Sequence, residues 1–255
     1  MKLLLFDAMN LIRRIYAAQE KHSDAIEQTC LLSQNAMLKD MEKIGATHVA
    51  CVFDGKGPTW RHHMFAAYKA DRKPMPDELA QALPMLMERF KSLGIACILF
   101  DEYEADDVIA TLAVKTSEKG GFVTIVSTDK GFMQIACDHI RLYHHFDKRF
   151  LGFDDVRQQL GLEPHQLVDF LSLVGDTTNH VPGISGIGPK TAGQLLDEYG
   201  DLDQILINSE SIKGKVGQTL QQDYRTALRA RKLVTLKTDC HLELNLQDLR
   251  YQPPS

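Results

Sequence analysis

The chain has little cysteine, and its cysteines follow no metal-binding or disulfide pattern. They are odd in number, scattered, and never arranged as Cys-x-x-Cys: Cys30, Cys51, Cys97, Cys137 and Cys240. This usage argues against a disulfide framework and against a structural zinc site, both of which need paired or closely spaced thiols. We therefore expect reduced thiols and a cytoplasmic protein.

Long apolar runs are also missing. The run LLLF at residues 3–6 has the length of a strand, and Asp7 and Asn10 interrupt the sequence before a signal peptide or a membrane span could form. No low-complexity tract is present, and 255 residues can bury a full core in one large or two smaller domains. We expect no association with a membrane.

The chain has no excess of positive charge, since its net charge is −5. Nucleic-acid partners are nevertheless compatible with this sum, because the charges are segregated along the chain. Basic residues gather in residues 56–73 and 213–232, whereas all charged residues of 101–107 are acidic. Each stretch alone is typical of a solvated surface. Together they are what a phosphodiesterase that uses a metal ion requires.

Apolar runs and helical patterns alternate in the first half of the chain. Strands are expected at 2–6, 48–53, 95–100, 122–127 and 140–143, and helices at 24–43, 77–93 and 104–118. This alternation predicts a mostly parallel sheet flanked by helices, over residues 1–150. Short helical patterns with glycine-rich turns follow, so residues 151–255 are expected to form a helical subdomain. Residues 55–76, rich in Gly and Pro, are expected to form a long mobile loop of functional importance.

Carboxylates follow four of the expected strands. Asp7, Asp54 and Asp129 come at or just after strand ends, and the first turn of the helix at 104–118 adds Glu104, Asp106 and Asp107. The ends of parallel strands meet at one edge of a sheet, where such folds bind ligands. Six carboxylates there would repel one another unless a cation neutralised them, and oxygen ligands suit Mg²⁺ or Mn²⁺. Any one of these acids alone is explained as well by a turn or by a helix dipole.

Several motifs occur in an order that resembles a known family. They are LLLFDAMNLIRR, VACVFDG, YKADRKPMPDEL, EADDVIATLA, IVSTDKGFMQI and VPGISGIGPKTA. The chain resembles the 5′-nucleases over residues 2–237, that is, the flap endonucleases and the N-terminal nuclease domain of bacterial DNA polymerase I. It is most similar to the stand-alone bacterial flap endonucleases, because no polymerase segment follows.

The resemblance implies a catalytic site and a fold. It implies a PIN-like α/β nuclease subdomain with an arch at about 55–76, and a helix–three-turn–helix for DNA binding at about 173–200. Lys69 and Arg72 of the arch are expected to act on the scissile phosphate, together with Asp7 and Asp54. The expected magnesium ligands are Glu104, Asp106, Asp107, Asp129 and Asp176.

Two departures from the family pattern leave fewer acidic ligands for a second metal ion. Gly131 stands where the family commonly has an aspartate, and the stretch GDTTNH keeps Asp176 but continues with Asn179 and His180. One tightly bound divalent ion is therefore expected. His180 could replace a ligand only if a partner lay nearby, and the spacing offers none.

The segment PGISGIGPKTA is expected to bind a DNA phosphate. Its glycines permit tight turns and Pro189 suits the first turn of a helix, so the exposed amides there would bind a phosphate whatever the base. The DNA-contacting residues are expected to be Gly186, Ile187, Gly188, Pro189, Lys190 and Thr191. The resemblance also implies a K⁺ ion held by the carbonyls of Leu173, Val174, Pro182, Ile184 and Ile187.

These features favour a magnesium-dependent flap endonuclease that acts as a monomer on DNA with a 5′ flap or a branched end. Two alternatives remain open at this point: a related nuclease directed at RNA, and a structure-specific DNA-binding protein that has lost catalysis. A flavin- or nucleotide-binding protein is disfavoured, because no glycine-rich phosphate loop follows the first strand.

Overall fold

The computed structural model describes residues 1–253, apart from the side chains of residues 159 and 160. It divides into two compact units. Unit 1 comprises residues 1–59, 74–151 and 237–255, and unit 2 comprises residues 60–73 and 152–236. The structure differs from the expected domains in two segments, since residues 60–73 group with the helical unit and residues 237–255 group with the α/β unit.

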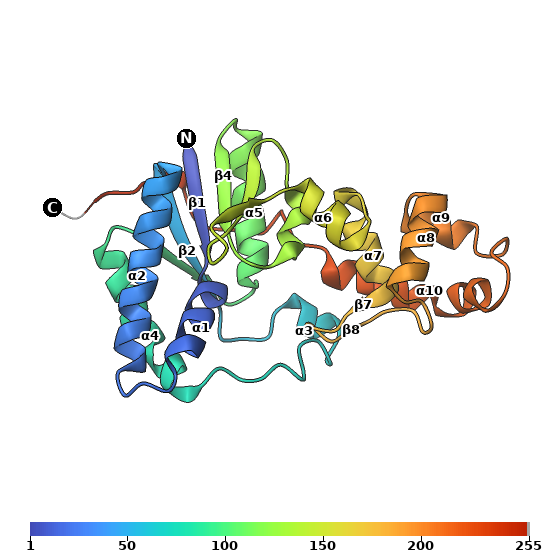
Figure 1. The fold of residues 1–255 in the computed structure, drawn as a ribbon, viewed down its shortest axis with the longest axis horizontal. Coiled ribbons are helices and arrows are strands. Elements are labelled where there is room, and N and C mark those ends of the chain that lie inside the picture. Colours follow the sequence, from blue (N-terminus) through green and yellow to red (C-terminus); the bar gives the residue numbers. More distant parts are fainter. Residues whose placement is uncertain (254–255) are drawn as a thin grey trace. The chain divides into compact units, whose positions relative to one another are not determined.

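Unit 1 is built on a six-stranded sheet with the order β3-β2-β1-β4-β5-β6 (Figure 1). All neighbouring pairs are parallel except β5 and β6, so the predicted mostly parallel sheet is confirmed. The strand order reverses between β1 and β4, and such a switch point is where open α/β sheets bind ligands. The strands are β1 (Lys2–Asp7), β2 (His48–Asp54), β3 (Ala96–Phe100), β4 (Phe122–Val126), β5 (Ile140–His144) and β6 (Arg149–Leu151).

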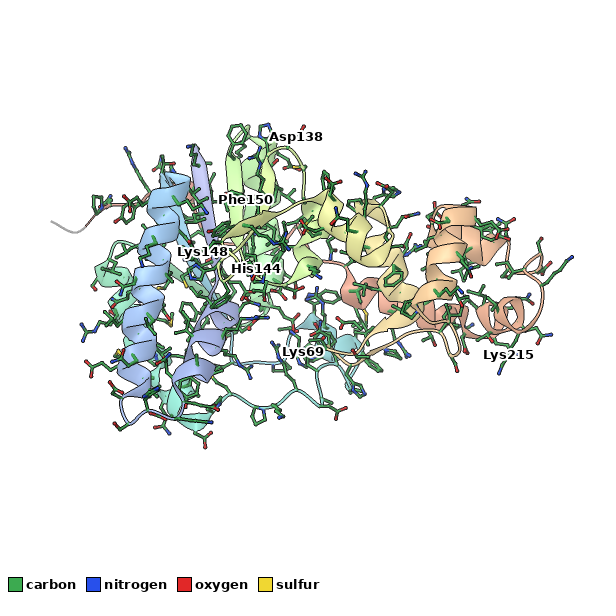
Figure 2. The ribbon with its side chains drawn as sticks, in the orientation of Figure 1. Lys69, Asp138, His144, Lys148, Phe150 and Lys215 are labelled. Carbon is green, nitrogen blue, oxygen red and sulfur yellow. The ribbon has the colours of Figure 1, made fainter. Side chains whose placement is uncertain are left out.

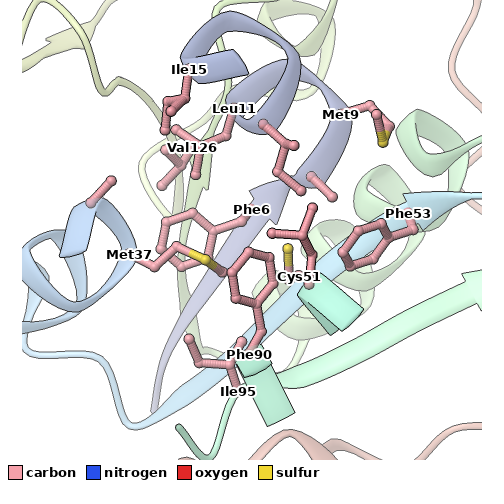
Figure 3. Close-up of a cluster of buried hydrophobic side chains, with 14 of the residues drawn as sticks. Phe6, Met9, Leu11, Ile15, Met37, Cys51, Phe53, Phe90, Ile95 and Val126 are labelled. Carbon is pink, nitrogen blue, oxygen red and sulfur yellow. The ribbon is translucent and has the colours of Figure 1, made fainter. Parts of the chain in front are cut away.

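Helices cover both faces of this sheet because the strands are apolar on both sides. Even-numbered residues of β1, such as Phe6, join a core with Met37 of α2 and Phe90 of α4 (Figure 3). Odd-numbered residues such as Leu5 are also fully buried, and α5 packs against the strands with its own apolar stripe. The helical elements are α1 (Ala8–Gln19), α2 (Ala25–Ile44), α4 (Asp77–Ser92), α5 (Ala105–Glu118) and the 3₁₀ turns η1 (Lys130–Ile135) and η3 (Leu246–Leu249).

The segment from residue 237 onward completes unit 1. The backbone N–H of Lys237 donates to Asp107 (2.9 Å), and the N–H of Cys240 donates to the hydroxyl of Thr111 (3.2 Å). Farther along, the N–H of Tyr251 donates to the carbonyl of Thr47 (3.0 Å). Asp107 and Thr111 lie four residues apart on α5, so one face of that helix holds this segment.

Unit 2 consists mainly of helices and also contains residues 60–73. These residues are ordered by α10, because Arg61 Nε donates to the carbonyl of Leu233 (2.7 Å) and Tyr68 is buried beside Ala230 and Leu233. Within the long loop expected at 55–76, residues 60–73 therefore contain a short helix and contact α10. The elements are α3 (Trp60–Met64), α6 (Phe153–Leu160), η2 (Pro164–Gln166), α7 (Leu167–Val174), β7 (Gly175–Asp176), β8 (Val181–Pro182), α8 (Pro189–Tyr199), α9 (Leu202–Ile207) and α10 (Lys215–Val234).

Within residues 1–253, no helix combines the length and the apolar character that crossing a membrane demands.

Candidate active site

Asp7 lies at the switch point of the sheet, as the last residue of β1 and the N-cap of α1. Its side chain is buried and accepts hydrogen bonds from Ser127 Oγ (2.8 Å) and from the backbone N–H of Asn10 (3.2 Å). Burial raises the pKa of Asp7 to about 7, and the negative charges of Asp54 and Asp129 add to that shift. Three of the predicted carboxylates therefore share one electrostatic environment.

The N-terminus of α5 brings further carboxylates to the same edge of the sheet. Asp54, which ends β2, accepts a hydrogen bond from the backbone N–H of Ala105 (3.0 Å). Glu104 is the N-cap residue of that helix and is buried, and Asp106 is half-buried in its first turn. The helix dipole favours negative charge at this end, where these acids gather.

Asp129 is exposed and closes the turn after β4. Its Oδ1 accepts a hydrogen bond from the backbone N–H of Gly131 (2.7 Å). A side chain at position 131 would meet that same carboxylate, because an added Cβ would lie 3.0 Å from Asp129 Oδ1. The glycine that departs from the family pattern therefore lies directly against a predicted ligand.

A hydroxyl and amide network supports these acids, and the sequence analysis missed it. Ser127 Oγ donates to Asp7 and accepts from the backbone N–H of Asp129 (3.0 Å), so it joins the two carboxylates. Asn10 donates from Nδ2 to Thr128 Oγ1 (2.9 Å), which ties α1 to the same turn. The signal was present in the sequence, because Ser127 and Thr128 stand between a buried strand and an acid.

Asp107 has a different environment from its neighbour Asp106. It is fully buried at 0% exposure, and its Oδ1 accepts the hydrogen bond from Lys237 that anchors the last segment of unit 1. Asp107 therefore holds the last segment of unit 1, and its predicted role as a magnesium ligand beside Glu104 and Asp106 stays a prediction.

The oxygen chemistry of this edge fits a hard divalent cation. Among residues 1–253, no group of three or more His, Cys, Asp or Glu side chains is spaced to enclose a metal ion. Mg²⁺ does not need such an enclosure, because it keeps several waters and commonly takes only one or two carboxylates directly. The raised pKa of Asp7, with Asp54 and Asp129 as contributing charges, is the mark of carboxylates that a cation would relieve.

Lys69 and Arg72, the two basic side chains predicted to be catalytic, belong to unit 2. Lys69 has a positive φ of 55°, which is uncommon for a residue with a side chain, and its N–H donates to the carbonyl of Asn179 (2.9 Å). Its ammonium lies 5.2 Å from the ring centroid of Tyr68 (Figure 2). Arg72 is exposed, and its N–H donates to the carbonyl of Lys69 (3.0 Å). Because Tyr68 is buried, it serves as packing for this segment and has no free face for a base.

Asp176, predicted as a metal ligand, also lies in unit 2. One oxygen accepts from the backbone N–H of Thr178 (2.9 Å), and the other accepts from Asn179 Nδ2 (2.6 Å). His180 forms an ion pair with Asp71 (2.8 Å) when it is protonated. Asn179 and His180, which form the second departure from the family pattern, thus fix the hairpin and the segment that carries Lys69.

The carbonyls predicted to bind K⁺ come from the C-terminus of α7 and the hairpin after it. Gly175 pairs with Pro182, and Ile184 N–H donates to the carbonyl of Leu173 (2.8 Å), so the two stretches are held together. Gly183 allows this approach, since an added Cβ there would collide with the backbone of Val174 and Gly175. Helix C-termini carry partial negative charge, which favours a cation at this place.

The N-terminus of α8 has the features expected of a phosphate site. Gly186 has a positive φ of 78° and Gly188 is the N-cap, while Pro189 occupies the first turn. The side of the loop at Gly186 and Gly188 is open, because an added Cβ at either position would meet no atom within 4 Å. The amides of Lys190 and Thr191 belong to the first turn, where a helix leaves N–H groups without internal partners.

Family models match nearly the whole chain. The model described as "5'-3' exonuclease, N-terminal resolvase-like domain" matches residues 2–161, and "5'-3' exonuclease, C-terminal SAM fold" matches residues 162–255. Among curated relatives, Flap endonuclease Xni of Psychromonas ingrahamii is 42% identical over 98% of this chain and 97% of its own. Flap endonuclease Xni of Tolumonas auensis is 43% identical over 99% of both chains.

Solved structures share the fold at lower sequence identity. The T5 D15 protein co-crystallised with metal ions superimposes with a TM-score of 0.79 at 20% identity, covering 93% of this chain and 90% of that chain. The catalytic core of Rad2 in complex with a DNA substrate has a TM-score of 0.60 at 16% identity, covering 99% of this chain and 82% of that chain.

Proposed function

We propose that this chain, which belongs to the 5′-3′ exonuclease family and is a flap endonuclease, hydrolyses phosphodiesters of DNA at 5′ flaps and branched ends with Mg²⁺, or alternatively Mn²⁺. The observation that carries the assignment to this edge of the sheet is the environment of Asp7. Its pKa of about 7 results from burial and from the charges of Asp54 and Asp129 at the switch point. A buried carboxyl group that faces two further acids at such a switch point is a candidate for holding a cation.

We assign the metal to Asp7, Asp54, Glu104, Asp106 and Asp129. When bound, the ion would supply a water of lowered pKa and would offset charge on the phosphate. Ser127 and the N-terminus of α5 orient the carboxylates for this purpose. Because Asp176 is engaged by Asn179 and position 131 is glycine, we propose one tightly held divalent ion.

In this proposal, unit 2 supplies the positively charged catalytic side chains and the contacts to the DNA backbone. Lys69 and Arg72 stabilise negative charge that develops on the scissile phosphate. The amides at the start of α8 hold a backbone phosphate without reading bases, and a K⁺ ion at the carbonyls of the α7–β8 hairpin supports that contact. We further propose that the enzyme acts as a monomer in the cytoplasm, a location that its scattered free cysteines favour.

Neighbouring aspartates of α5 provide the test. Asp106→Ala should abolish cleavage of a labelled flap substrate in Mg²⁺, while binding of the same DNA in Ca²⁺ and the melting temperature stay close to wild type. Asp107→Ala is the matched control, and it should retain cleavage but lower the melting temperature. It removes the acceptor of the part-buried Lys237 N–H, which costs about 1–3 kcal/mol of stability.

A near wild-type cleavage rate for Asp106→Ala would show that the metal site is wrongly assigned. Retained stability of Asp107→Ala together with complete loss of cleavage would move Asp107 into the active site.

A further inference from the structure

Unit 1 has a second candidate binding site at the end of the sheet opposite the acidic edge. A groove of about 370 Å³ opens beside the first residues of β1, β4 and β5. Its lining includes three permanent cations and no Asp or Glu. We call it the basic groove and define it by Lys2, Lys43, Phe122, His139, Arg141 and Phe150.

The strand register explains why these side chains meet. Lys2 pairs with Phe122 across β1 and β4, and Arg141 and Tyr143 alternate on β5, with Tyr143 opposite Phe150 of β6. All of them therefore lie on the face that also carries the core with α2. That core includes Tyr143 but none of the other four residues. This face therefore carries exposed side chains at the first residues of β1, β4 and β5 and on β6.

The cations of the groove are oriented without being neutralised by carboxylates. Lys43 Nζ donates to the hydroxyl of Tyr143 (2.9 Å) and to the carbonyl of Lys148 (3.3 Å), which are both neutral acceptors. Lys2 Nζ donates to the carbonyl of Ile44 (3.4 Å). The guanidinium of Arg141 forms no hydrogen bond or ion pair with any part of residues 1–253 that the structure describes. The positive charge is thus available to an anionic ligand.

Two exposed aromatic rings flank these cations. Phe122 is 51% exposed and stacks one face on His139, with ring centroids 4.6 Å apart and planes at 7°. Phe150 is 42% exposed and leans against Tyr143 at 5.2 Å. Phe150, Lys148 and His144 all belong to the β5–β6 hairpin (Figure 2). Exposed rings beside cations are the combination that binds unpaired bases and their backbone.

We propose that the basic groove binds single-stranded DNA, with bases stacked on Phe122 and Phe150 and phosphates held by Lys2, Lys43 and Arg141. A strand fits better than a single phosphate, because Lys2 and Arg141 stand two strands apart, which is about 10 Å across a sheet. This binding site goes beyond the cleavage site proposed above and does not require that site to be correct.

The test uses a short single-stranded oligodeoxynucleotide in EDTA, so that binding is measured without cleavage. A photoreactive base in the probe should cross-link to Phe122 or Phe150, as mapped by mass spectrometry. The double variant Phe122→Ala/Arg141→Ala should weaken binding about tenfold or more, since each stacked base contributes substantially. The slope of log Kd against log salt should also fall by about 0.7 for the phosphate that is lost.

The matched control is Phe146→Ala/Lys91→Ala, which removes another exposed ring and one charge outside the groove. It should leave the dissociation constant unchanged, and both double variants should cleave a short-flap substrate at the wild-type rate at saturating enzyme. Equal binding by both double variants, or cross-links only outside the groove, would overturn the proposal. Competition by a free mononucleotide at the same concentration of nucleotide units would also overturn it, since the groove would then be a mononucleotide pocket.

Discussion

Burial and neighbouring negative charge make Asp7 difficult to ionise, with a pKa of about 7 against an ordinary 3.8. In the metal-free protein, the folded chain therefore binds more protons than the unfolded chain between these two values. It follows that the free energy of unfolding decreases as the pH rises from about 4 to about 7, and stays low above that. A bound divalent ion would cancel this penalty, because it favours the ionised carboxylate.

We predict that Asp7→Asn stabilises the protein in EDTA at pH 8 and has little effect at pH 4. The gain has an upper bound of about 4 kcal/mol, at about 1.4 kcal/mol for each unit of pKa shift. Urea unfolding over a pH series measures it, with the exposed Asp138→Asn as a control. Parallel pH profiles for wild type and Asp7→Asn would contradict the electrostatic picture of the site. Mg²⁺ should stabilise wild type more than it stabilises Asp7→Asn.

Lys69 offers a second test at the scale of one residue. If its ammonium acts on the transition state, Lys69→Ala should lower the single-turnover rate about a hundredfold to a thousandfold, with a much smaller change in the dissociation constant. Lys73→Ala removes the same charge from the same segment and should change binding more than rate. An unchanged rate with weaker binding would make Lys69 a positioning contact.

At the scale of elements, the hairpin between α7 and α8 separates a specific ion effect from general screening. A K⁺ ion at the carbonyls of Leu173 and Val174 should make DNA binding tighter in KCl than in NaCl at equal ionic strength. Counterion release alone weakens binding about equally in both salts. Fluorescence anisotropy in the two salts measures the difference. Gly183→Ala, which brings a Cβ against Val174, should remove any preference for K⁺.

The elements themselves could be predicted from the sequence where a local pattern decides them. The runs before Asp7, Asp54 and Asp129 are strands, and α8 begins at Pro189 as expected. Helix α1 was missed because no loop residue separates it from β1, since Asp7 is both the last strand residue and the N-cap. The sequence pattern of helix α5 does not show that Asp107 and Asp106 have different surroundings, because Lys237, which donates to Asp107, lies 130 residues away.

Distant contacts also explain why local patterns predict only a loop at residues 55–76. The flanking glycines and prolines are real turn signals, but Arg61 binds the carbonyl of Leu233, which is 172 residues away. Short-range patterns contain no information on such a contact. The same limit applies to the segment after residue 236, whose place in unit 1 depends on Asp107 and Thr111.

At the scale of the whole molecule, we predict that unit 1 needs its last segment. A chain that stops after Leu236 would lose the partners of Asp107, Thr111 and Thr47, and it would also lose the buried side chains of Cys240 and Leu249. Its melting temperature should fall by several degrees, since one kcal/mol shifts the melting temperature of such a chain by about 2–4 °C. Calorimetry of the shortened chain checks this, and an unchanged transition would show that the segment is dispensable.

The path of the chain through the two units also constrains how the protein can fold during its synthesis. The backbone leaves unit 1 after residue 59, returns at 74, leaves again after 151, and returns at 237. A ribosome releases the N-terminal strands first, yet the residues that cover α5 emerge last. The sheet of unit 1 therefore lacks the contacts of its last segment until all of unit 2 has been translated. This enzyme should acquire its full resistance to proteolysis only after release, in contrast to chains whose domains follow one another in order.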